Sequence, residues 1–291
     1  METVIGLGSA GCHIVDEFAK YDQNEVYKVD TGLDGLMETR YGNFPEKGIY
    51  SLAKQPGPEE YEANCPDMSY YFKNIKGEVL FIVGGSGDVS GASLAILEQL
   101  RHCEINILYI RPDIELLSPK KKAHERASFN ILQEYARSAV FKRIFLIDNS
   151  MVEDHLGDVP LVGYYSRLNE LIVSTIHMIN VYNHLKPLAH TFSEPHETAR
   201  LSTVGLADLK TGESKLFFPL DNLREMRYYY AINKEKLKSD GSLSKKIKTQ
   251  VKESSSENTA VSYGIYSTQY KEDYVYTMGH SSIIQTGEND D

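Results

Sequence analysis

Apolar and polar positions follow two different patterns in the first half of the chain. Short continuous apolar runs are separated by stretches in which apolar residues recur at intervals of three and four. The first pattern predicts strands buried on both faces, and the second predicts amphipathic helices. The buried strands are expected at 3–5, 26–30, 79–83, 105–110 and 144–147. Strands that alternate with helices indicate a parallel, doubly wound α/β sheet.

The intervening segments differ in character. Helices are expected at 92–100 and 123–136, where the apolar spacing is helical. Residues 41–77 are instead rich in proline and glycine and show one short helical stretch, at 59–64. We expect this segment to be a long, loop-rich excursion from the sheet.

The second half begins with a long helical pattern from 162 to about 183. Its apolar face is formed by Tyr165, Leu168, Ile172, Ile176 and Ile179. Strands are expected after it, at 201–209, 214–220, 226–232, 261–266 and 274–278, with a basic helical stretch at 234–252.

These patterns predict four parts. They are an α/β domain at 1–161, a central helix at 162–185, a smaller α+β domain at 186–284 and an acidic, disordered tail at 285–291.

Composition narrows the class of protein. A chain of 291 residues is long enough for two packed units. Its net charge of −10 argues against nucleic acid or an anionic membrane as the main partner. The cysteines at 12, 65 and 103 are too widely spaced to indicate a disulfide framework or a metal site. No apolar run has the length of a membrane span, and we expect a cytoplasmic protein.

Two of the predicted strands run directly into glycine-rich loops. Residues 84–91, Gly-Gly-Ser-Gly-Asp-Val-Ser-Gly, follow the strand at 79–83 and precede a helix. Glycines let the main chain turn its N–H groups inward, and a helix N-terminus carries a partial positive charge. Such a loop binds phosphate well, although a tight turn without a ligand is the alternative.

The first loop, residues 6–11, has the GxGxxG spacing of dinucleotide-binding folds. Asp30 follows Gly11 by 19 residues, where a ribose-binding acid would stand. The residues therefore allow an NAD-dependent oxidoreductase with a Rossmann domain. The second glycine loop, and the lack of an evident hydride-transfer constellation in the C-terminal half, speak against it.

The order of these loops resembles the tubulin/FtsZ superfamily. The first loop stands where that family has its first phosphate loop, and residues 30–36 resemble its Asn-Thr-Asp-x-x-x-Leu segment. Residues 85–91 are similar to the signature GGGTG[ST]G. The resemblance covers nearly the whole chain, with strong motif similarity confined to 3–170. It implies a nucleotide-binding α/β domain, a long central helix and an α+β domain.

The resemblance also implies a site for GTP or GDP. Arg126 and Asn149 are 23 residues apart, like the family's base- and ribose-contacting residues. Tyr165 and Asn169, one helical turn apart, resemble the ring that stacks on guanine and the side chain that reads its edge, with simple packing as the alternative. The implied nucleotide-binding residues are Gly8, Ser9, Ala10, Gly11, Cys12, Asp30, Gly85, Ser86, Gly87, Asp88, Val89, Ser90, Arg126, Asn149, Tyr165 and Asn169.

Several positions depart from the family's pattern. His13, Asp88 and Val89 stand where the family has asparagine, threonine and glycine, and Lys122 replaces the ribose-binding glutamate. A carboxylate in a phosphate loop repels phosphate unless a metal ion bridges them, so Asp88 either helps to hold Mg²⁺ or weakens triphosphate binding. The loop that senses the terminal phosphate is reduced to about 55–58.

The catalytic motif is the largest departure. Residues 188–197 lack the Asn-x-Asp-x-x-Asp pattern whose carboxylates polarise the attacking water in the family. We therefore expect a guanine-nucleotide-binding protein that self-associates head to tail, as a homo-oligomer or cytoskeletal filament, with weak or lost GTP hydrolysis. A nucleotide-free scaffold that kept the fold is the other alternative.

Overall fold

The computed structural model describes residues 2–33 and 48–287. The chain divides into two compact units, 1–173 and 174–291, and the boundary falls within the long helix α7 (Tyr164–His184). Among the described residues, no helix combines the length and the apolar character that crossing a membrane requires.

The first unit is built on a parallel sheet with strand order β3-β2-β1-β4-β5-β6. The strands are β1 (Glu2–Leu7), β2 (Asn24–Thr31), β3 (Ile49–Leu52), β4 (Glu78–Gly84), β5 (Glu104–Arg111) and β6 (Arg143–Asp148). The central strands are mostly apolar because both faces of the sheet are covered by helices. Residues 79–83 of β4 are all buried, for example.

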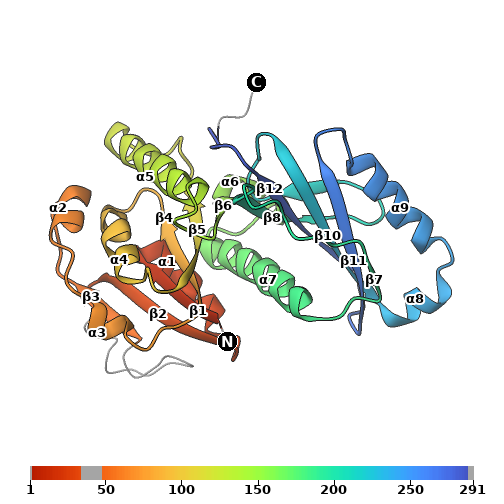
Figure 1. Ribbon diagram of the computed structural model, residues 1–291, viewed down its shortest axis with the longest axis horizontal. Helices are drawn as coiled ribbons and strands as arrows, with labels where there is room; N and C mark the ends of the chain where they lie inside the picture. Colours follow the sequence, from red (N-terminus) through yellow and green to blue (C-terminus); the bar gives the residue numbers. More distant parts are fainter. Residues whose placement is uncertain (1, 34–47, 288–291) are drawn as a thin grey trace. The chain divides into compact units, whose positions relative to one another are not determined.

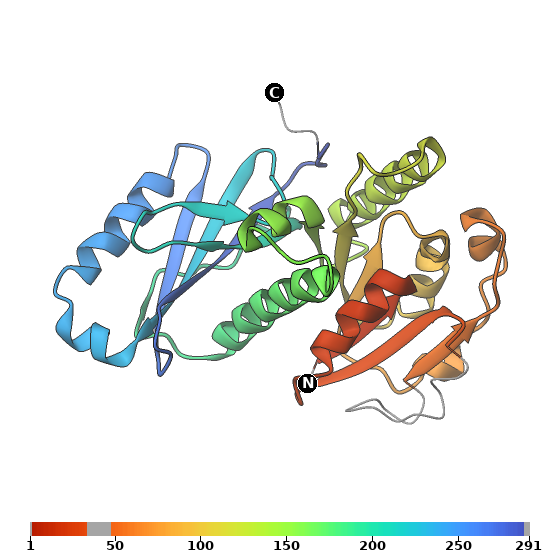
Figure 2. The same cartoon turned by 180° about the vertical axis from the view of Figure 1, so that it is seen from behind.

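The helices of this unit connect the strands. They are α1 (Gly8–Phe18), α2 (Pro58–Ala63), α3 (Ser69–Phe72), α4 (Ser93–Gln99), α5 (Pro119–Arg137) and α6 (Asn149–Leu156), with a 3₁₀ turn, η2 (Asp88–Ala92), before α4. Helix α1 covers one face of the sheet, and α4 and α5 cover the other (Figures 1 and 2). This follows from right-handed crossovers that run toward β3 on one side of β1 and toward β6 on the other.

The expected strands and long helices of this half are present, with three additions. The sequence pattern did not predict β3, α3 or α6, which are short elements of four, four and eight residues. The helix expected at 59–64 is α2, and the helix expected at 92–100 starts as the 3₁₀ turn η2. Residues 34–36 of the motif at 30–36 lie outside the described part of the chain.

The second unit contains a mixed sheet with strand order β8-β12-β10-β11-β7, and β9 pairs with β8. Strands β10 and β11 are parallel, and the other pairs are antiparallel. The elements are β7 (Ala189–His190), β8 (Leu201–Ala207), β9 (Ser214–Leu216), β10 (Leu223–Asn233), α8 (Lys234–Ser239), α9 (Leu243–Ser254), β11 (Ala260–Thr268) and β12 (Tyr274–Ser281). The strand predicted at 214–220 is shorter than expected: β9 ends at Leu216, and Phe217 and Phe218, which follow it, are buried.

Tyrosines on β10 fix this sheet between two layers. Tyr228 and Tyr230 lie in a core with Leu243 and Ile247 of α9, and the Tyr230 hydroxyl donates to Gln250 Oε1 at 3.0 Å. Tyr229 points to the opposite face and donates to Asn183 Oδ1 of α7 at 2.8 Å. Alternation along a strand places neighbouring residues on opposite faces, so β10 is buried on both.

The segment expected as a C-terminal tail begins with a residue that packs in the second unit. Gln285 is fully buried, and its Oε1 accepts a hydrogen bond from the Asp221 main-chain N–H at 2.6 Å. Residues 288–291, which carry the acidic end of the expected tail, lie outside the described part of the chain.

Candidate functional site

A cavity of about 460 Å³ opens at the carboxyl ends of the strands in the first unit. Strand order reverses between β1 and β4, and ligands of open α/β sheets bind in the crevice at this switch point. The volume falls within the range of small-molecule sites, roughly 300–1,000 Å³. The lining residues are Leu7, Gly8, Ser9, Ala10, His13, Asp30, Gly84, Gly85, Ser86, Gly87, Val89, Ser90, Ile110, Pro112, Asn149 and Tyr165.

The first loop brings the N-terminus of α1 to the cavity. Gly8 has a φ of +71°, a left-handed conformation that favours glycine, and Ser9 and Ala10 line the cavity beside it. No side chain caps this helix, and no acidic residue lies in its first turn. The first N–H groups of a helix have no partner within it, so α1 offers main-chain donors to an anion.

Gly11 and Cys12 do not line the cavity, although the sequence predicted both as nucleotide-binding residues. A Cβ on Gly11 would lie 2.7 Å from the carbonyl oxygen of Ile82, so this glycine allows α1 to approach β4. Cys12 is buried beneath the loop, and burial raises the pKa of its thiol to about 12. Both residues face the core because they lie on the inner side of α1.

The second loop supplies most of the opposite wall. Gly84, Gly85, Ser86, Gly87, Val89 and Ser90 line the cavity. Gly85 lies over the Tyr109 hydroxyl, which would be 2.0 Å from a Cβ at this position. Asp88 begins η2, is exposed and does not line the cavity. The structure thus separates Asp88 from the other loop residues that the sequence predicted.

Asp30 carries the carboxylate among the described lining residues. Its Oδ1 accepts from the Thr31 main-chain N–H at 2.7 Å. Burial raises the pKa of Asp30, while the Thr31 hydrogen bond and the nearby His13 oppose this shift. His13 also lines the cavity, although the sequence indicated it only as a departure from the family's pattern.

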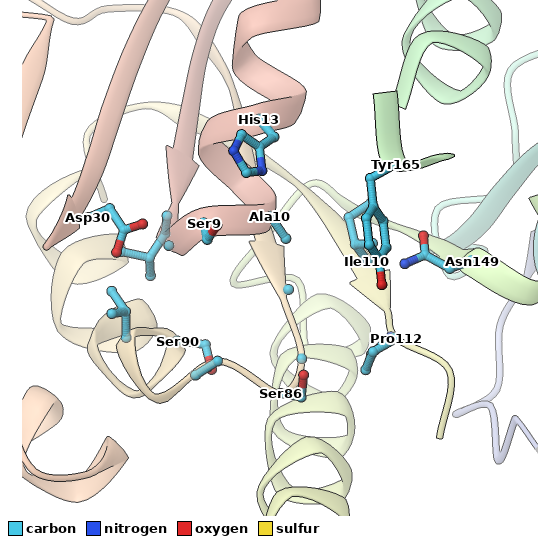
Figure 3. A pocket seen from close by; sticks show the side chains of 16 residues that line it. Ser9, Ala10, His13, Asp30, Ser86, Ser90, Ile110, Pro112, Asn149 and Tyr165 are labelled. Carbon is cyan, nitrogen blue, oxygen red and sulfur yellow. The ribbon is translucent and has the colours of Figure 1, made fainter. Parts of the chain in front are cut away.

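Aromatic, apolar and amide groups form the other end of the cavity. Figure 3 shows Asp30 and Ser90 at one end, and Tyr165, Pro112 and Asn149 at the other. The Tyr165 side chain is 66% exposed, so its ring is accessible. Asn149 is the first residue of α6, and Asp148 caps that helix by accepting from the Ser150 N–H at 2.9 Å. This cap places Asn149 at the edge of the cavity.

Arg126 and Asn169 are the remaining predicted residues outside the cavity lining. Helix α5 buries Glu125 against the sheet, and Arg126, about 100° further around the helix, is exposed. Asn169 is half-buried and follows Leu168, which is fully buried. Of the two pairs that the sequence predicted, Asn149 and Tyr165 therefore line the cavity, whereas Arg126 and Asn169 do not.

A buried group of charges lies next to the cavity and was not predicted from the sequence. The Arg111 guanidinium lies 3.6 Å from Glu125 Oε1 and 3.7 Å from Asp148 Oδ2. The Tyr109 hydroxyl donates to Glu125 Oε1 at 3.1 Å. Burial raises the pKa of Glu125, and Arg111 and Tyr109 oppose the shift. The signal available in the sequence was Arg111 itself, a charged residue at the end of an apolar strand.

The described residues contain no cluster of three or more histidine, cysteine or acidic side chains that could hold a metal ion. Mg²⁺ is commonly held by one or two carboxylates together with substrate phosphates. The described residues that line the cavity therefore do not by themselves define a set of Mg²⁺ ligands.

Comparisons with known proteins agree with this geometry. No family model and no curated protein matches the sequence. Among solved structures, the GDP-form protofilaments of TubZ from Bacillus thuringiensis serovar israelensis have a TM-score of 0.74 at 15% identity, with 96% of this chain and 86% of that chain covered.

Two further structures are similar. CetZ1 from Haloferax volcanii, a GDP-bound monomer, has a TM-score of 0.68 at 17% identity and covers 97% of this chain and 94% of that one. The empty FtsZ dimer from M. jannaschii has a TM-score of 0.62 at 11% identity, covering 96% and 88%. All three are tubulin/FtsZ superfamily members. The resemblance seen in the loop motifs is thus confirmed at the level of structure, and this chain has the tubulin/FtsZ fold.

Proposed function

We propose that the cavity of the first unit binds a guanine nucleotide. The observation that carries the proposal is the two-ended cavity, with uncapped helix N–H groups and a glycine loop at one end and an accessible tyrosine ring at the other. A nucleotide has the same division, with anionic phosphates at one end and a flat base at the other. Main-chain donors suit phosphate, and an aromatic face suits a base.

The roles of the residues follow from their places. The N–H groups at Gly8, Ser9 and Ala10, together with the loop from Gly85 to Ser90, hold the phosphates. Tyr165 stacks on the base, and the Asn149 amide, which can both donate and accept, lies at the same end of the cavity. Mg²⁺, when bound together with the nucleotide, would neutralise phosphate charge.

Similar structures support the choice of nucleotide. TubZ has been solved as GDP-form and GTPγS-form protofilaments, and CetZ1 as a GDP-bound monomer. The fold by itself does not fix the ligand, so the assignment to this chain depends on the cavity and its residues.

We also propose that the protein self-associates head to tail, as a homo-oligomer or filament in the cytoplasm. TubZ structures include two-stranded and four-stranded filaments. In this arrangement 1–161 is the nucleotide-binding domain, 162–185 the central helix and 186–284 the α+β domain.

Hydrolysis of GTP in such an assembly would be weak or lost. Residues 188–197 contain two glutamates, Glu194 and Glu197, both exposed in the second unit, without the spacing of the family's acidic motif. The two glutamates then do not take the positions from which the motif's carboxylates orient an attacking water.

Tyr165→Ala tests the base end of the site. We expect the affinity for GTP to fall by roughly tenfold, because stacking of a base on an aromatic ring contributes about 1–3 kcal/mol. Tyr165→Phe keeps the ring and should bind GTP nearly as well as the wild type. Calorimetric titration measures the affinities, and circular dichroism checks the fold.

The matched control is Tyr70→Ala. Tyr70 is 65% exposed, almost the same as Tyr165, and lies on α3 outside the cavity. It should leave the affinity unchanged. Equal affinities of Tyr165→Ala and the wild type would contradict the assignment of the base.

A further inference from the structure

Ser90, Gly87 and His124 form a small hydrogen-bonded triangle at the edge of the cavity. The Ser90 hydroxyl oxygen lies 2.6 Å from the carbonyl oxygen of Gly87 and 2.9 Å from Nε2 of His124. The same Nε2 lies 3.3 Å from the Gly87 carbonyl oxygen. Ser90 and Gly87 belong to the glycine loop, whereas His124 comes from α5.

The distances decide where the protons are. A carbonyl oxygen can only accept, so the 2.6 Å contact requires that Ser90 donates its one hydroxyl proton to Gly87. Ser90 then has no proton left for His124, and the 2.9 Å contact requires a proton on Nε2 that is donated to the Ser90 oxygen. The geometry thus assigns His124 as a donor through Nε2.

This arrangement lets Ser90 change its partner. Ser90 lines the cavity, so a phosphate bound there could accept its hydroxyl proton. Ser90 is only 6% exposed, so bulk water has little access to it. If the hydroxyl turns toward the phosphate, the Gly87 carbonyl loses one donor. The His124 Nε2–H group, already within 3.3 Å, can take over that carbonyl, and the Ser90 main-chain N–H remains bound to it at 3.0 Å.

We propose that His124 is a positioning residue of the nucleotide site, which frees the Ser90 hydroxyl to donate to phosphate. The inference rests on the proposed function, because it needs an anion beside Ser90. His124 itself does not line the cavity and acts through Ser90. It borders a second, smaller hollow of about 150 Å³ on the other side of Ser90.

The proton assignment can be tested without any nucleotide. Nitrogen-15 spectra of the histidine-labelled wild-type protein at pH 8 should show His124 Nε2 protonated, with a single-residue variant used to assign the signal. A proton on Nδ1 with a bare Nε2 would overturn the proposal, because His124 could not then donate to Ser90.

Binding is tested by calorimetry with GTP. His124→Ala should lower the affinity by about five- to tenfold, because a charge-assisted hydrogen bond to phosphate is weakened. His124→Gln, whose amide nitrogen can occupy a place similar to that of Nε2, should restore the affinity to within about twofold. The control is His102→Ala, which removes another histidine bonded to a main-chain carbonyl, Ile75 at 3.1 Å, and should have no effect.

A double-mutant cycle separates positioning from general damage. Ser90→Ala should weaken binding as His124→Ala does, and the double variant should be no weaker than Ser90→Ala alone, because His124 acts only through that hydroxyl. Additive losses, or full affinity in His124→Ala, would overturn the inference while leaving nucleotide binding intact. Failure of the wild type to bind any nucleotide would instead contradict the proposed function and, with it, the positioning role.

Discussion

The two glycine loops look alike in sequence and use their glycines differently. In the first loop, Gly6 and Gly11 face each other inside the fold, and only Gly8 reaches the cavity. In the second loop, Gly84, Gly85 and Gly87 line the cavity. Gly85 also packs against the Tyr109 hydroxyl and Gly91 packs against the Pro58 carbonyl oxygen, whereas a Cβ on Gly87 would meet no described atom within 4 Å. A glycine-rich pattern can therefore indicate close packing of the main chain as well as a ligand-binding loop. The atoms around each glycine show which of the two applies.

The largest effect is expected at a packing glycine. A Cβ on Gly6 would lie 2.4 Å from the Gly11 carbonyl oxygen, and neither main chain can move without separating α1 from β1. Gly6→Ala should lower the free energy of unfolding by about 2–3 kcal/mol, a typical cost of overpacking a core. Urea denaturation measures it. An unchanged midpoint would show that the two loops do not differ in this way.

A cavity glycine should behave in the opposite way. Gly87 has a φ of −80°, which alanine adopts easily, and none of the described atoms lies within 4 Å of the place that a Cβ would occupy. Gly87→Ala should therefore change the free energy of unfolding by less than about 0.5 kcal/mol. It should weaken GTP binding several-fold, because the methyl group enters the space that phosphate needs. Loss of stability with full affinity would reverse the assignment.

The charge of Asp30 should affect the affinity of the cavity for GTP. Its carboxylate faces the phosphate end, so Asp30→Asn should raise the affinity for GTP at pH 7.5 by about two- to fivefold. Burial raises the pKa of Asp30, so the wild-type carboxyl is protonated at a higher pH than an exposed one, and the difference from the variant should shrink as the pH falls. Calorimetry at several pH values measures it.

The raised pKa also has a consequence for stability. The folded protein holds this proton to a higher pH than the unfolded chain, so the contribution of Asp30 to the free energy of unfolding falls as the pH rises through the raised pKa. Weaker binding by Asp30→Asn at every pH would show instead that the carboxylate accepts a hydrogen bond from the ligand.

Asp88 should give the smallest effect. The sequence offered two roles for its carboxylate in a phosphate loop, but the side chain is exposed and lies outside the cavity lining. Water and salt screen an exposed charge. Asp88→Thr should therefore change the affinity for GTP by less than about twofold, with and without Mg²⁺. A large shift in the Mg²⁺ dependence would place this carboxylate at the metal.

Much of the fold could be predicted because buried parallel strands have a strong signal. The runs at 79–83, 105–110 and 144–147 are apolar at every position, or nearly so, since helices cover both faces of the sheet. The short elements β3 and α3 carry no such signal, because each has only four residues in a segment rich in turns. Helix α6 was not predicted because the residue that caps it, Asp148, is also the last residue of the preceding strand.

The residues that line the cavity could be predicted where the order of strands and loops alone determines their place. Gly8, Gly85 and Asn149 come directly after strands, and parallel strands bring their carboxyl ends to one edge. The side Cys12 faces depends on how α1 rotates against the sheet. Arg126 is exposed because Glu125, beside it, points inward to Arg111. Neither the orientation of Cys12 nor the exposure of Arg126 can be predicted from spacing along the chain.

The most direct measurement is calorimetric titration of the purified protein with GTP, GDP, ATP and NAD, each with and without Mg²⁺. We predict saturable binding of GTP and GDP that is clearly tighter than binding of ATP or NAD. Preference for NAD would point to a dinucleotide site around Asp30. Silence from all four ligands would contradict the central claim and leave the protein as a scaffold with the tubulin/FtsZ fold.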